Sequence, residues 1–346
     1  MLVQVASYLH KTGCQVVIRL TLFFGRQDVP KGLFPIELSL TRLAVLLLIT
    51  GLLFDFSSKP AKAECAFSQA TVNVGGGEIH YDRAGIGQPV ILLHGLFAQK
   101  EQWQDVLCTL AAAGFDAIAL DLPGFGQSEE YPVTVYDLNR QVELLDNFIG
   151  MLGIKELTLA GNSMGGAIAA LYAEQFPGKV RQLAFIGPPL GLVPWGPRVR
   201  QAIIQGVNPF IPTDNTQFGL EMALLFADPP EVAEEVRNSL VSDYVTQNHH
   251  YQQVWDIINL FNTVLQDPAS ERLPGETPVL ILWGASDAIY PVGGAEPLHQ
   301  RLHNSWLVTL PETGHLPMME KPAETGKLLV QFLRKFASQE AASGRQ

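Results

Sequence analysis

The sequence predicts an α/β fold built on a mostly parallel, doubly wound sheet. Short, mainly apolar runs recur at 89–93, 115–120, 157–160, 183–186, 279–283 and 306–310. Strands that are apolar on both faces belong inside parallel sheets that helices cover on both sides. Stretches with helical periodicity separate most of these runs, and that alternation is typical of a doubly wound sheet.

A hairpin is expected before the parallel strands. Apolar residues alternate with polar ones on either side of a Gly75-Gly76-Gly77 turn, between Thr71 and Arg83. This pattern predicts two antiparallel strands. Helices are predicted near 103–113, 134–152, 164–175, 295–302 and 322–336.

A helical cap is expected in the middle of the chain, at 188–273. This region contains helical stretches at 199–204, 218–226, 232–245 and 251–265, and it lacks strand-like runs. We therefore expect a core domain made of 64–187 and 274–338, interrupted by the cap. The last residues, 339–346, are expected to form a disordered tail.

Residues 1–63 have the features of a targeting segment. Arg42 precedes an uncharged apolar run, Leu43 to Phe54, and Ala61-Lys62-Ala63 supplies a small-x-small cleavage site. As a helix the run would span about 18 Å, less than the roughly 30 Å of a bilayer core, so it fits a signal peptide better than a stable span. Secretory leaders usually have about 15 to 30 residues, so an uncleaved N-terminal membrane anchor is the alternative. Both versions predict an exported, periplasmic or extracellular protein; a cytoplasmic protein with an apolar N-terminal helix is the third possibility.

Composition narrows the function classes. The 346 residues carry a formal net charge of −11, which argues against a nucleic-acid partner because a basic stripe is lacking. The sequence contains no C-x-x-C, H-E-x-x-H or G-x-x-x-x-G-K-[ST] motif, so we expect neither a metal site nor a bound nucleotide cofactor. Cys65 and Cys108 would remain after loss of Cys14 with the leader, and the sequence leaves their pairing open.

The stretch LTLAGNSMGGAIAA, from Leu157 to Ala170, is the most informative part of the chain. An apolar strand leads into G-x-S-x-G and then into small residues that open a helix. This pattern is typical of a nucleophile elbow, in which Ser163 stands on a strained turn. The residues two positions away, Gly161 and Gly165, are nearly free of side chain, as such a turn requires. By itself the motif would occur by chance about 0.1 times in a chain of this length, so a simple Gly/Ser turn is the alternative.

A carboxylate and a histidine follow in the order that the elbow needs. Asp287 stands in the loop after the strand at 279–283, and His315 lies between the last strand and the last helix. The other loop that could supply an acid, after the strand at 183–186, holds Gly187 and no carboxylate. The alternative for Asp287 is a turn-forming aspartate.

The remaining histidines fit the role of base less well. His94 stands beside Gly95 at a strand end, where we expect it to orient a loop. The others lie in the leader, the hairpin, the cap and one helix, at His10, His80, His249, His250, His299 and His303.

These residue types match the needs of acyl transfer. A serine hydroxyl becomes a nucleophile when an imidazole takes its proton, and a carboxylate fixes the imidazole tautomer. The oxyanion needs backbone N–H donors, each worth about 3 to 4 kcal/mol. We expect one from Met164 and the second from the loop after His94-Gly95, with Leu96 favoured over Phe97.

Taken together, the motifs resemble those of the α/β-hydrolase superfamily, from about Val72 to Phe336. They are His94-Gly95 with Trp103, Asp121-x-Pro-Gly-x-Gly-x-Ser, Gly161-Asn162-Ser163-Met164-Gly165-Gly166, Trp283-Gly284-x-x-Asp287, and Gly314-His315 with Glu320-Lys321-Pro322. The resemblance implies an α/β-hydrolase fold with an inserted helical cap and a serine hydrolase that needs no cofactor. A serine at position 163 argues against haloalkane dehalogenases and epoxide hydrolases, whose members use aspartate there.

Two branches of the superfamily look similar. The segments HGLFAQKEQW and GHLPMMEKP resemble monoacylglycerol-lipase-like proteins and bacterial lipases or esterases. The elbow GNSMGG is also common in hydrolases that cleave carbon–carbon bonds of ring-fission dienoates. Those usually have a Gly-Pro-rich oxyanion loop and a tryptophan after the histidine, whereas this chain has Leu96-Phe97-Ala98 and Leu316.

We therefore expect an exported or membrane-anchored enzyme that hydrolyses carboxylic esters with an apolar acyl part, from a small-molecule or lipid substrate. Six cap residues are candidates to enclose the acyl chain: Phe210, Phe218, Met222, Leu225, Phe226 and Trp255. Ordinary packing of the cap helices is the alternative for each of them. A ligand-binding, receptor-like protein with slow turnover is the alternative from another class.

Overall fold

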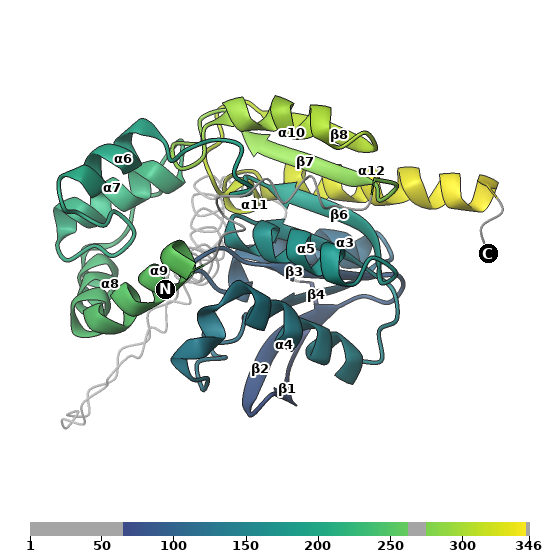
Figure 1. Cartoon of the computed structure of the whole chain (residues 1–346), viewed down its shortest axis with the longest axis horizontal. Coiled ribbons are helices and arrows are strands. Elements are labelled where there is room, and N and C mark those ends of the chain that lie inside the picture. Colours follow the sequence, from purple (N-terminus) through teal and green to yellow (C-terminus); the bar gives the residue numbers. More distant parts are fainter. Residues whose placement is uncertain (1–64, 262–274, 344–346) are drawn as a thin grey trace, which may run out of the picture. The chain divides into compact units, whose positions relative to one another are not determined.

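The computed structural model describes residues 65–261 and 275–343 (Figure 1). An eight-stranded sheet forms the centre of this part, in the order β1-β2-β4-β3-β5-β6-β7-β8. The strands are β1 (Ser68–Val74), β2 (Gly77–Ala84), β3 (Pro89–Leu93), β4 (Asp116–Leu120), β5 (Leu157–Asn162), β6 (Val180–Ile186), β7 (Val279–Gly284) and β8 (Ser305–Leu310). Strands β3 to β8 pair in parallel, and β1 and β2 form the antiparallel edge. The predicted α/β class and mostly parallel sheet are confirmed.

The apolar runs become the buried strands of the sheet. Every residue of β4, β5 and β7 is buried, because helices cover both faces. In contrast, β8 lies at the end of the sheet order and most of its residues are partly exposed. The hairpin between β1 and β2 turns at Gly75 and Gly76, whose φ angles of 62° and 97° are readily adopted by glycine.

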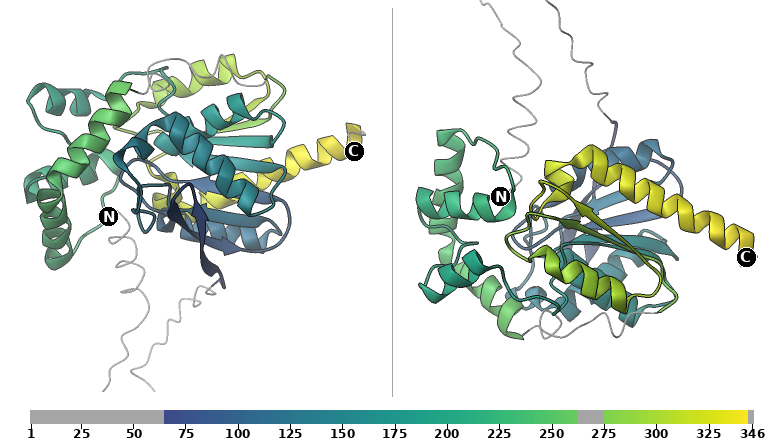
Figure 2. Two further views of the ribbon diagram at one scale, coloured as in Figure 1. Left: turned by 60° about the horizontal axis from the view of Figure 1, so that its bottom comes forward. Right: turned by 90° about the horizontal axis from the view of Figure 1, so that it is seen from above.

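Helices pack on the two faces of the sheet. Helix α3 (Gln104–Ala112) packs against α12 (Pro322–Ser343), and α4 (Leu138–Met151) packs against α5 (Met164–Gln175). Figure 2 shows α12 and α10 (Ala295–Arg301) on opposite sides of the strands. Residues 339–343 continue α12, so the expected disordered tail was wrong for these positions. Their Gln, Glu and Ala residues favour helix, which explains the continuation.

The cap occupies the chain between β6 and β7. Its described residues form α6 (Pro197–Ile204), α7 (Asn215–Leu225), α8 (Glu234–Thr246) and α9 (Asn248–Phe261). In Figure 1 these helices, in teal and green, lie beyond the end of the sheet toward which the arrowhead of β7 points. The carboxyl ends of parallel strands are where such sheets bind ligands, so the cap covers the expected site.

The predicted leader at 1–63 lies outside the described residues. In the ranges 65–261 and 275–343, none of the helices combines the length and apolarity needed to cross a bilayer. Both Cys65 and Cys108, whose pairing the sequence left open, are disulfide-bonded.

Candidate active site

The predicted elbow joins β5 to α5. Ser163 has φ 51° and ψ −121°, a backbone conformation that residues other than glycine rarely adopt. A Cβ atom on Gly161 would lie 2.2 Å from the carbonyl oxygen of Gly165, and one on Gly165 would lie 2.5 Å from the carbonyl oxygen of Leu93. These contacts are with backbone, which cannot move aside. The turn therefore requires glycine at both positions, as the sequence predicts.

Asp287 and His315 meet at the carboxyl end of the sheet. The Nδ1 atom of His315 lies 2.8 Å from Oδ2 of Asp287, and both side chains are buried. The other oxygen of Asp287, Oδ1, accepts the backbone N–H groups of Ile289 and Tyr290, each at 2.9 Å. Because a carboxylate oxygen only accepts, Nδ1 of His315 carries the proton and Nε2 is left as the acceptor. This is the tautomer that a general base needs.

Gly187 lies directly beside this pair. A Cβ atom at this position would be 3.0 Å from Oδ2 of Asp287 and 3.2 Å from Nδ1 of His315. Its φ of 53° also favours glycine. The sequence excluded the loop after β6 as the source of the acid. Because this loop has glycine at position 187, it leaves room for the side chains of Asp287 and His315.

Asn162 connects the elbow to the loop that carries His315. Its buried Nδ2 group donates hydrogen bonds to the carbonyl oxygens of Ile186 and His315, both at 3.1 Å. The backbone N–H of His315 in turn donates to the carbonyl oxygen of Leu225, at the end of α7, at 2.8 Å. The position of the histidine is therefore fixed by the sheet and by the cap together.

Glu320 holds the same loop from the other side. Its two carboxylate oxygens accept the backbone N–H groups of Gly314, at 2.6 Å, and Ala227, at 2.8 Å. The sequence analysis missed the positioning roles of Asn162 and Glu320, although both stand inside its motifs. Position 162 directly precedes the nucleophile, and that adjacency was the available signal.

The loop after β3 forms a tight turn. The backbone N–H of Ala98 donates to the carbonyl oxygen of Gly95 at 3.2 Å, so Leu96 and Phe97 occupy the turn. Phe97 has φ 56°, where the matching turn type usually places glycine. Within the described ranges, the backbone N–H groups of Leu96, Phe97 and Met164 have no acceptor. Met164 and both candidates for the second oxyanion donor, Leu96 and Phe97, therefore have N–H groups free to bind a ligand.

His94 stabilises this loop and is not the base. Its Nε2 atom accepts the backbone N–H of Leu122 at 2.9 Å, so its Nδ1 atom is protonated and donates to the carbonyl oxygen of Gly95 at 2.7 Å. Burial lowers the pKa of His94 to about 4. The ring is neutral near pH 7 and uses both nitrogens to connect the loops after β3 and β4.

A buried lysine, which the sequence analysis did not single out, anchors the far end of the loop. The Nζ atom of Lys100 donates to Asp121, Glu101 and Gln127 at 2.9, 2.9 and 2.7 Å. Burial alone would lower the pKa of Lys100, but Asp121 and Glu101 raise it above its ordinary value. The amine therefore stays charged inside the protein.

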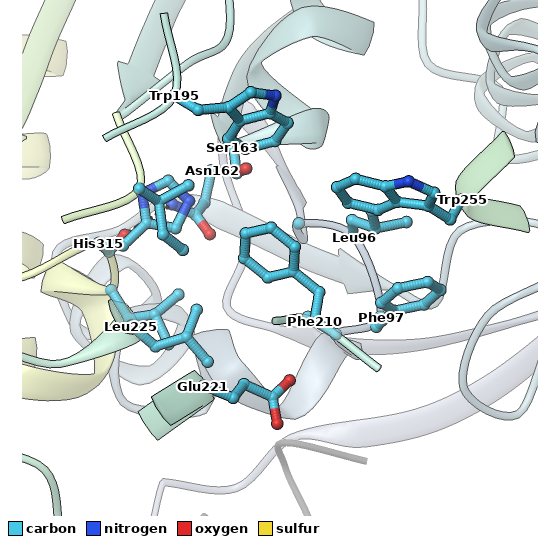
Figure 3. A pocket seen from close by; sticks show the side chains of 14 residues that line it. Leu96, Phe97, Asn162, Ser163, Trp195, Phe210, Glu221, Leu225, Trp255 and His315 are labelled. Carbon is cyan, nitrogen blue, oxygen red and sulfur yellow. Dashed lines mark hydrogen bonds between the residues drawn. The ribbon is translucent and has the colours of Figure 1, made fainter. Parts of the chain in front are cut away.

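A pocket opens beside Ser163 and His315 (Figure 3). Its polar side chains are those of Ser163, His315, Asn162 and Glu221. The rest of the lining is apolar, apart from Gly95: Leu96, Phe97, Ala98, Trp195, Phe210, Leu225, Trp255, Ile289 and Leu316. Mostly apolar walls with a few placed polar groups are typical of small-molecule sites.

Aromatic rings form one wall of this pocket. Trp195 stacks on Tyr290 with ring centres 4.7 Å apart and on Trp255 at 5.9 Å, and Phe210 stacks on Trp255 at 5.4 Å. Of the six predicted cap residues, Phe210, Leu225 and Trp255 line the pocket. The other three, Phe218, Met222 and Phe226, are buried away from it. In the part of the chain that the structure describes, no group of three His, Cys, Asp or Glu side chains is placed to hold a metal ion.

Comparisons with known proteins support the fold. A family model described as the alpha/beta hydrolase fold matches residues 88–322. Mouse monoacylglycerol lipase ABHD6 is 27% identical over 263 residues, which cover 72% of this chain and 77% of the lipase. The 2-hydroxy-6-oxo-6-(2'-aminophenyl)hexa-2,4-dienoic acid hydrolase of Metapseudomonas resinovorans is 30% identical over 290 residues, or 80% of this chain and 94% of that enzyme.

Among solved structures, a membrane phospholipase A described as a bacterial virulence factor is similar with a TM-score of 0.73 and 28% identity. The match covers 86% of this chain and 98% of the phospholipase. Because the family model spans more than half of the sequence and the fold and elbow agree with it, this chain belongs to the α/β-hydrolase fold family.

Proposed function

We propose that the protein is a serine hydrolase of carboxylic esters with an apolar acyl part, of the lipase or esterase type. One observation carries the proposal: Ser163, on its strained elbow, and the buried Asp287–His315 pair border the same apolar pocket. A nucleophile, a base with the correct tautomer and free N–H donors are the parts that acyl transfer needs.

In the proposed mechanism, Nε2 of His315 takes the proton of the Ser163 hydroxyl as its oxygen attacks the ester carbonyl. Asp287 holds the imidazole and stabilises its charged form. The N–H groups of Met164 and Leu96, or Phe97 in place of Leu96, bind the oxyanion. The alcohol leaves with the proton from His315, and a water activated by the same ring then hydrolyses the acyl-enzyme.

The pocket walls support an apolar acyl part. Phe210, Leu225 and Trp255 from the cap surround a volume that would favour a hydrocarbon chain over a charged group. The mouse monoacylglycerol lipase and the membrane phospholipase A, by their names, act on lipid esters. Both points support a lipid or small apolar ester as substrate.

The test is hydrolysis of p-nitrophenyl esters of graded chain length by the wild type and by Ser163→Ala. We expect turnover by the wild type and a loss of at least about 10³-fold in the variant. Circular dichroism would verify that the variant is folded. No ester turnover by the wild type, or equal turnover by both proteins, would show that the proposal is wrong and would favour a receptor-like role.

Carbon–carbon bond hydrolysis of a ring-fission dienoate is the second candidate. The similarity to the Metapseudomonas resinovorans enzyme favours it, because the match covers 94% of the length of that enzyme. The same panel should include one such dienoate. A kcat/KM for the dienoate above that for every ester would reverse the order of the two candidates.

We also propose that the protein is exported, either with cleavage after Ala63 or with the N-terminal segment kept as a membrane anchor. The apolar run Leu43 to Phe54 supports export, and so do the disulfide-bonded Cys65 and Cys108, because disulfides persist in oxidising compartments. Cell fractionation and N-terminal sequencing test this proposal. A mature chain that starts at Glu64, or an intact chain in the membrane fraction, is expected; an intact chain in the soluble cytoplasm would contradict it.

A further inference from the structure

Glu221 is an acidic side chain in an otherwise apolar part of the pocket wall. It belongs to α7 in the cap, is only 2% exposed, and lines the pocket together with Leu225. Residues four apart in a helix lie on the same face, so one face of α7 presents both side chains to the pocket. Figure 3 shows Glu221 well separated from Ser163, with the ring of Phe210 between them in this view.

The two oxygens of this carboxyl group differ in their partners. Oε1 accepts the hydroxyl of Tyr244, on α8, at 3.0 Å. Oε2 is buried and has no hydrogen-bond partner within residues 65–261 and 275–343. An unpaired buried polar atom costs about 1 to 3 kcal/mol, so a protein that retains one is expected to use it.

The link to Tyr244 explains only half of this arrangement. That hydrogen bond joins α7 to α8 and would serve cap stability, but it uses Oε1 alone. A glutamine or a smaller acceptor could make the same bond. The role of Oε2 must therefore be sought in the pocket that it borders.

The chemistry of the group indicates its ligand. Burial raises the pKa of Glu221 to about 8, so the side chain is an uncharged acid near pH 7. With Oε1 accepting from Tyr244, the proton resides on Oε2, which can then donate a hydrogen bond and also accept one. A hydroxyl group has the same two capacities. A cationic ligand would instead require the ionised carboxylate.

We propose that Glu221 is a specificity-determining residue whose Oε2 binds a hydroxyl group of the substrate, away from the ester that Ser163 attacks. The inference rests on the proposed function in that it takes this pocket as the substrate site. Two parts of an ester can carry such a hydroxyl: a polyol alcohol or a hydroxylated acyl chain. The test separates these sources.

The experiment measures binding of ethers, which cannot be hydrolysed, to the Ser163→Ala protein. Trp195 and Trp255 line the pocket, so quenching of tryptophan fluorescence reports occupancy. Three matched ligands are needed: octyl propyl ether, 1-O-octylglycerol and 8-hydroxyoctyl propyl ether. The last two carry hydroxyls at opposite ends of the same skeleton.

We expect one of the two hydroxylated ethers to bind about tenfold more tightly than octyl propyl ether, as one buried hydrogen bond would provide. Adding Glu221→Met should abolish this preference and leave the affinity for octyl propyl ether within about threefold, because methionine keeps length and apolar bulk. Adding Glu221→Gln should retain most of the preference, since its amide can accept from Tyr244 and still donate into the pocket.

Equal affinity of the Ser163→Ala protein for all three ethers would overturn the inference, and this result does not depend on whether the methionine variant folds. An equal loss of affinity for every ether in Glu221→Met would also overturn it, because a merely structural role predicts that result. Ester turnover is not involved in these measurements. A hydroxyl preference without any esterase activity would therefore contradict the proposed function alone.

Discussion

The Nζ atom of Lys100 lies 2.9 Å from Oδ2 of Asp121, in an ion pair whose side chains are 1% and 0% exposed. The pair joins the loop after β3 to the loop after β4. The first of these loops also contains Leu96 and Phe97, which line the pocket beside Ser163 and are the candidates for the second oxyanion donor. We infer that this buried ion pair helps to hold the loop, and with it the backbone N–H groups of Leu96 and Phe97, in place.

Replacing Lys100 with methionine should destabilise the protein and slow catalysis. The change leaves Asp121 buried without its cation, for which losses of about 3 to 5 kcal/mol are typical. Urea unfolding measures the loss, and kcat for a p-nitrophenyl ester reports the displaced loop. The matched control is Arg140→Met, which removes an ion pair with Glu143 whose side chains are 43% and 57% exposed and should cost less than about 1 kcal/mol. Similar losses for both variants would refute the anchoring role of Lys100.

Asp287→Asn should reduce kcat by about 10⁴-fold with little change in stability, because asparagine keeps the shape but favours the wrong histidine tautomer. Ester kinetics and thermal melting of the same preparations provide the two readouts. Glu320→Gln is the control. Glu320 also holds the His315 loop, but its two oxygens accept backbone N–H groups, one of which the amide oxygen of glutamine can still accept. We expect a larger effect on kcat at Asp287; the opposite ranking would contradict the assignment of the acid.

Gly165→Ala should disturb the elbow. The added Cβ would lie 2.5 Å from the carbonyl oxygen of Leu93 and 2.6 Å from that of His94, so the helix start or the strand must shift. Overpacking of this kind costs about 1 to 3 kcal/mol, and the displaced Ser163 should lower kcat as well.

Gly150→Ala tests whether this effect is specific to the elbow. Gly150 lies in α4, and an added Cβ there would meet nothing within 4 Å. Alanine should stabilise that helix by up to about 1 kcal/mol and leave kcat unchanged. Urea unfolding of the two variants should therefore give shifts of opposite sign.

The sequence predicts the parts of this site that depend on local pattern and chain order. Buried parallel strands have uninterrupted apolar runs, and the elbow has a characteristic glycine spacing. The sheet and the surroundings of Ser163 can therefore be predicted from the sequence. Lys100 and Glu221 are different. A charged residue in a helix or loop normally predicts exposure, and their burial depends on partners that lie far away in the sequence: Asp121 for the lysine and Tyr244 for the glutamate.

The cap shows the same limit. Phe218 and Leu225 are both buried apolar residues of α7, yet of the two only Leu225 lines the pocket, because the packing of α7 on its neighbours decides which side chains border the pocket. Trp195 precedes the cap helices in a segment without periodicity, so no sequence pattern predicts that it stacks on Trp255. Composition predicted an apolar cap, but three-dimensional packing selects the residues that a ligand would meet.

The buried acid of Glu221 should make stability fall as the pH rises. Its pKa is 4.5 in the unfolded reference and about 8 in the folded protein. Between these values the folded state binds a proton that the unfolded state releases, so the free energy of unfolding decreases with pH, by at most about 1.4 kcal/mol per pH unit. Below pH 4.5 both states are protonated, and above about 8 both have lost the proton, so the effect is confined to this window.

Glu221→Gln removes this titration while keeping an acceptor for Tyr244. Urea unfolding at several pH values from 5 to 8 should therefore show a stability difference between Glu221→Gln and the wild type that grows in favour of glutamine as the pH increases. His94, whose pKa is lowered to about 4, makes unfolding easier as the pH falls below 6.5, but it is present in both proteins and cancels in the difference. Parallel stability curves for the two proteins would mean that Glu221 is ionised in the folded state, and its Oε2 would then be an acceptor without a proton to donate.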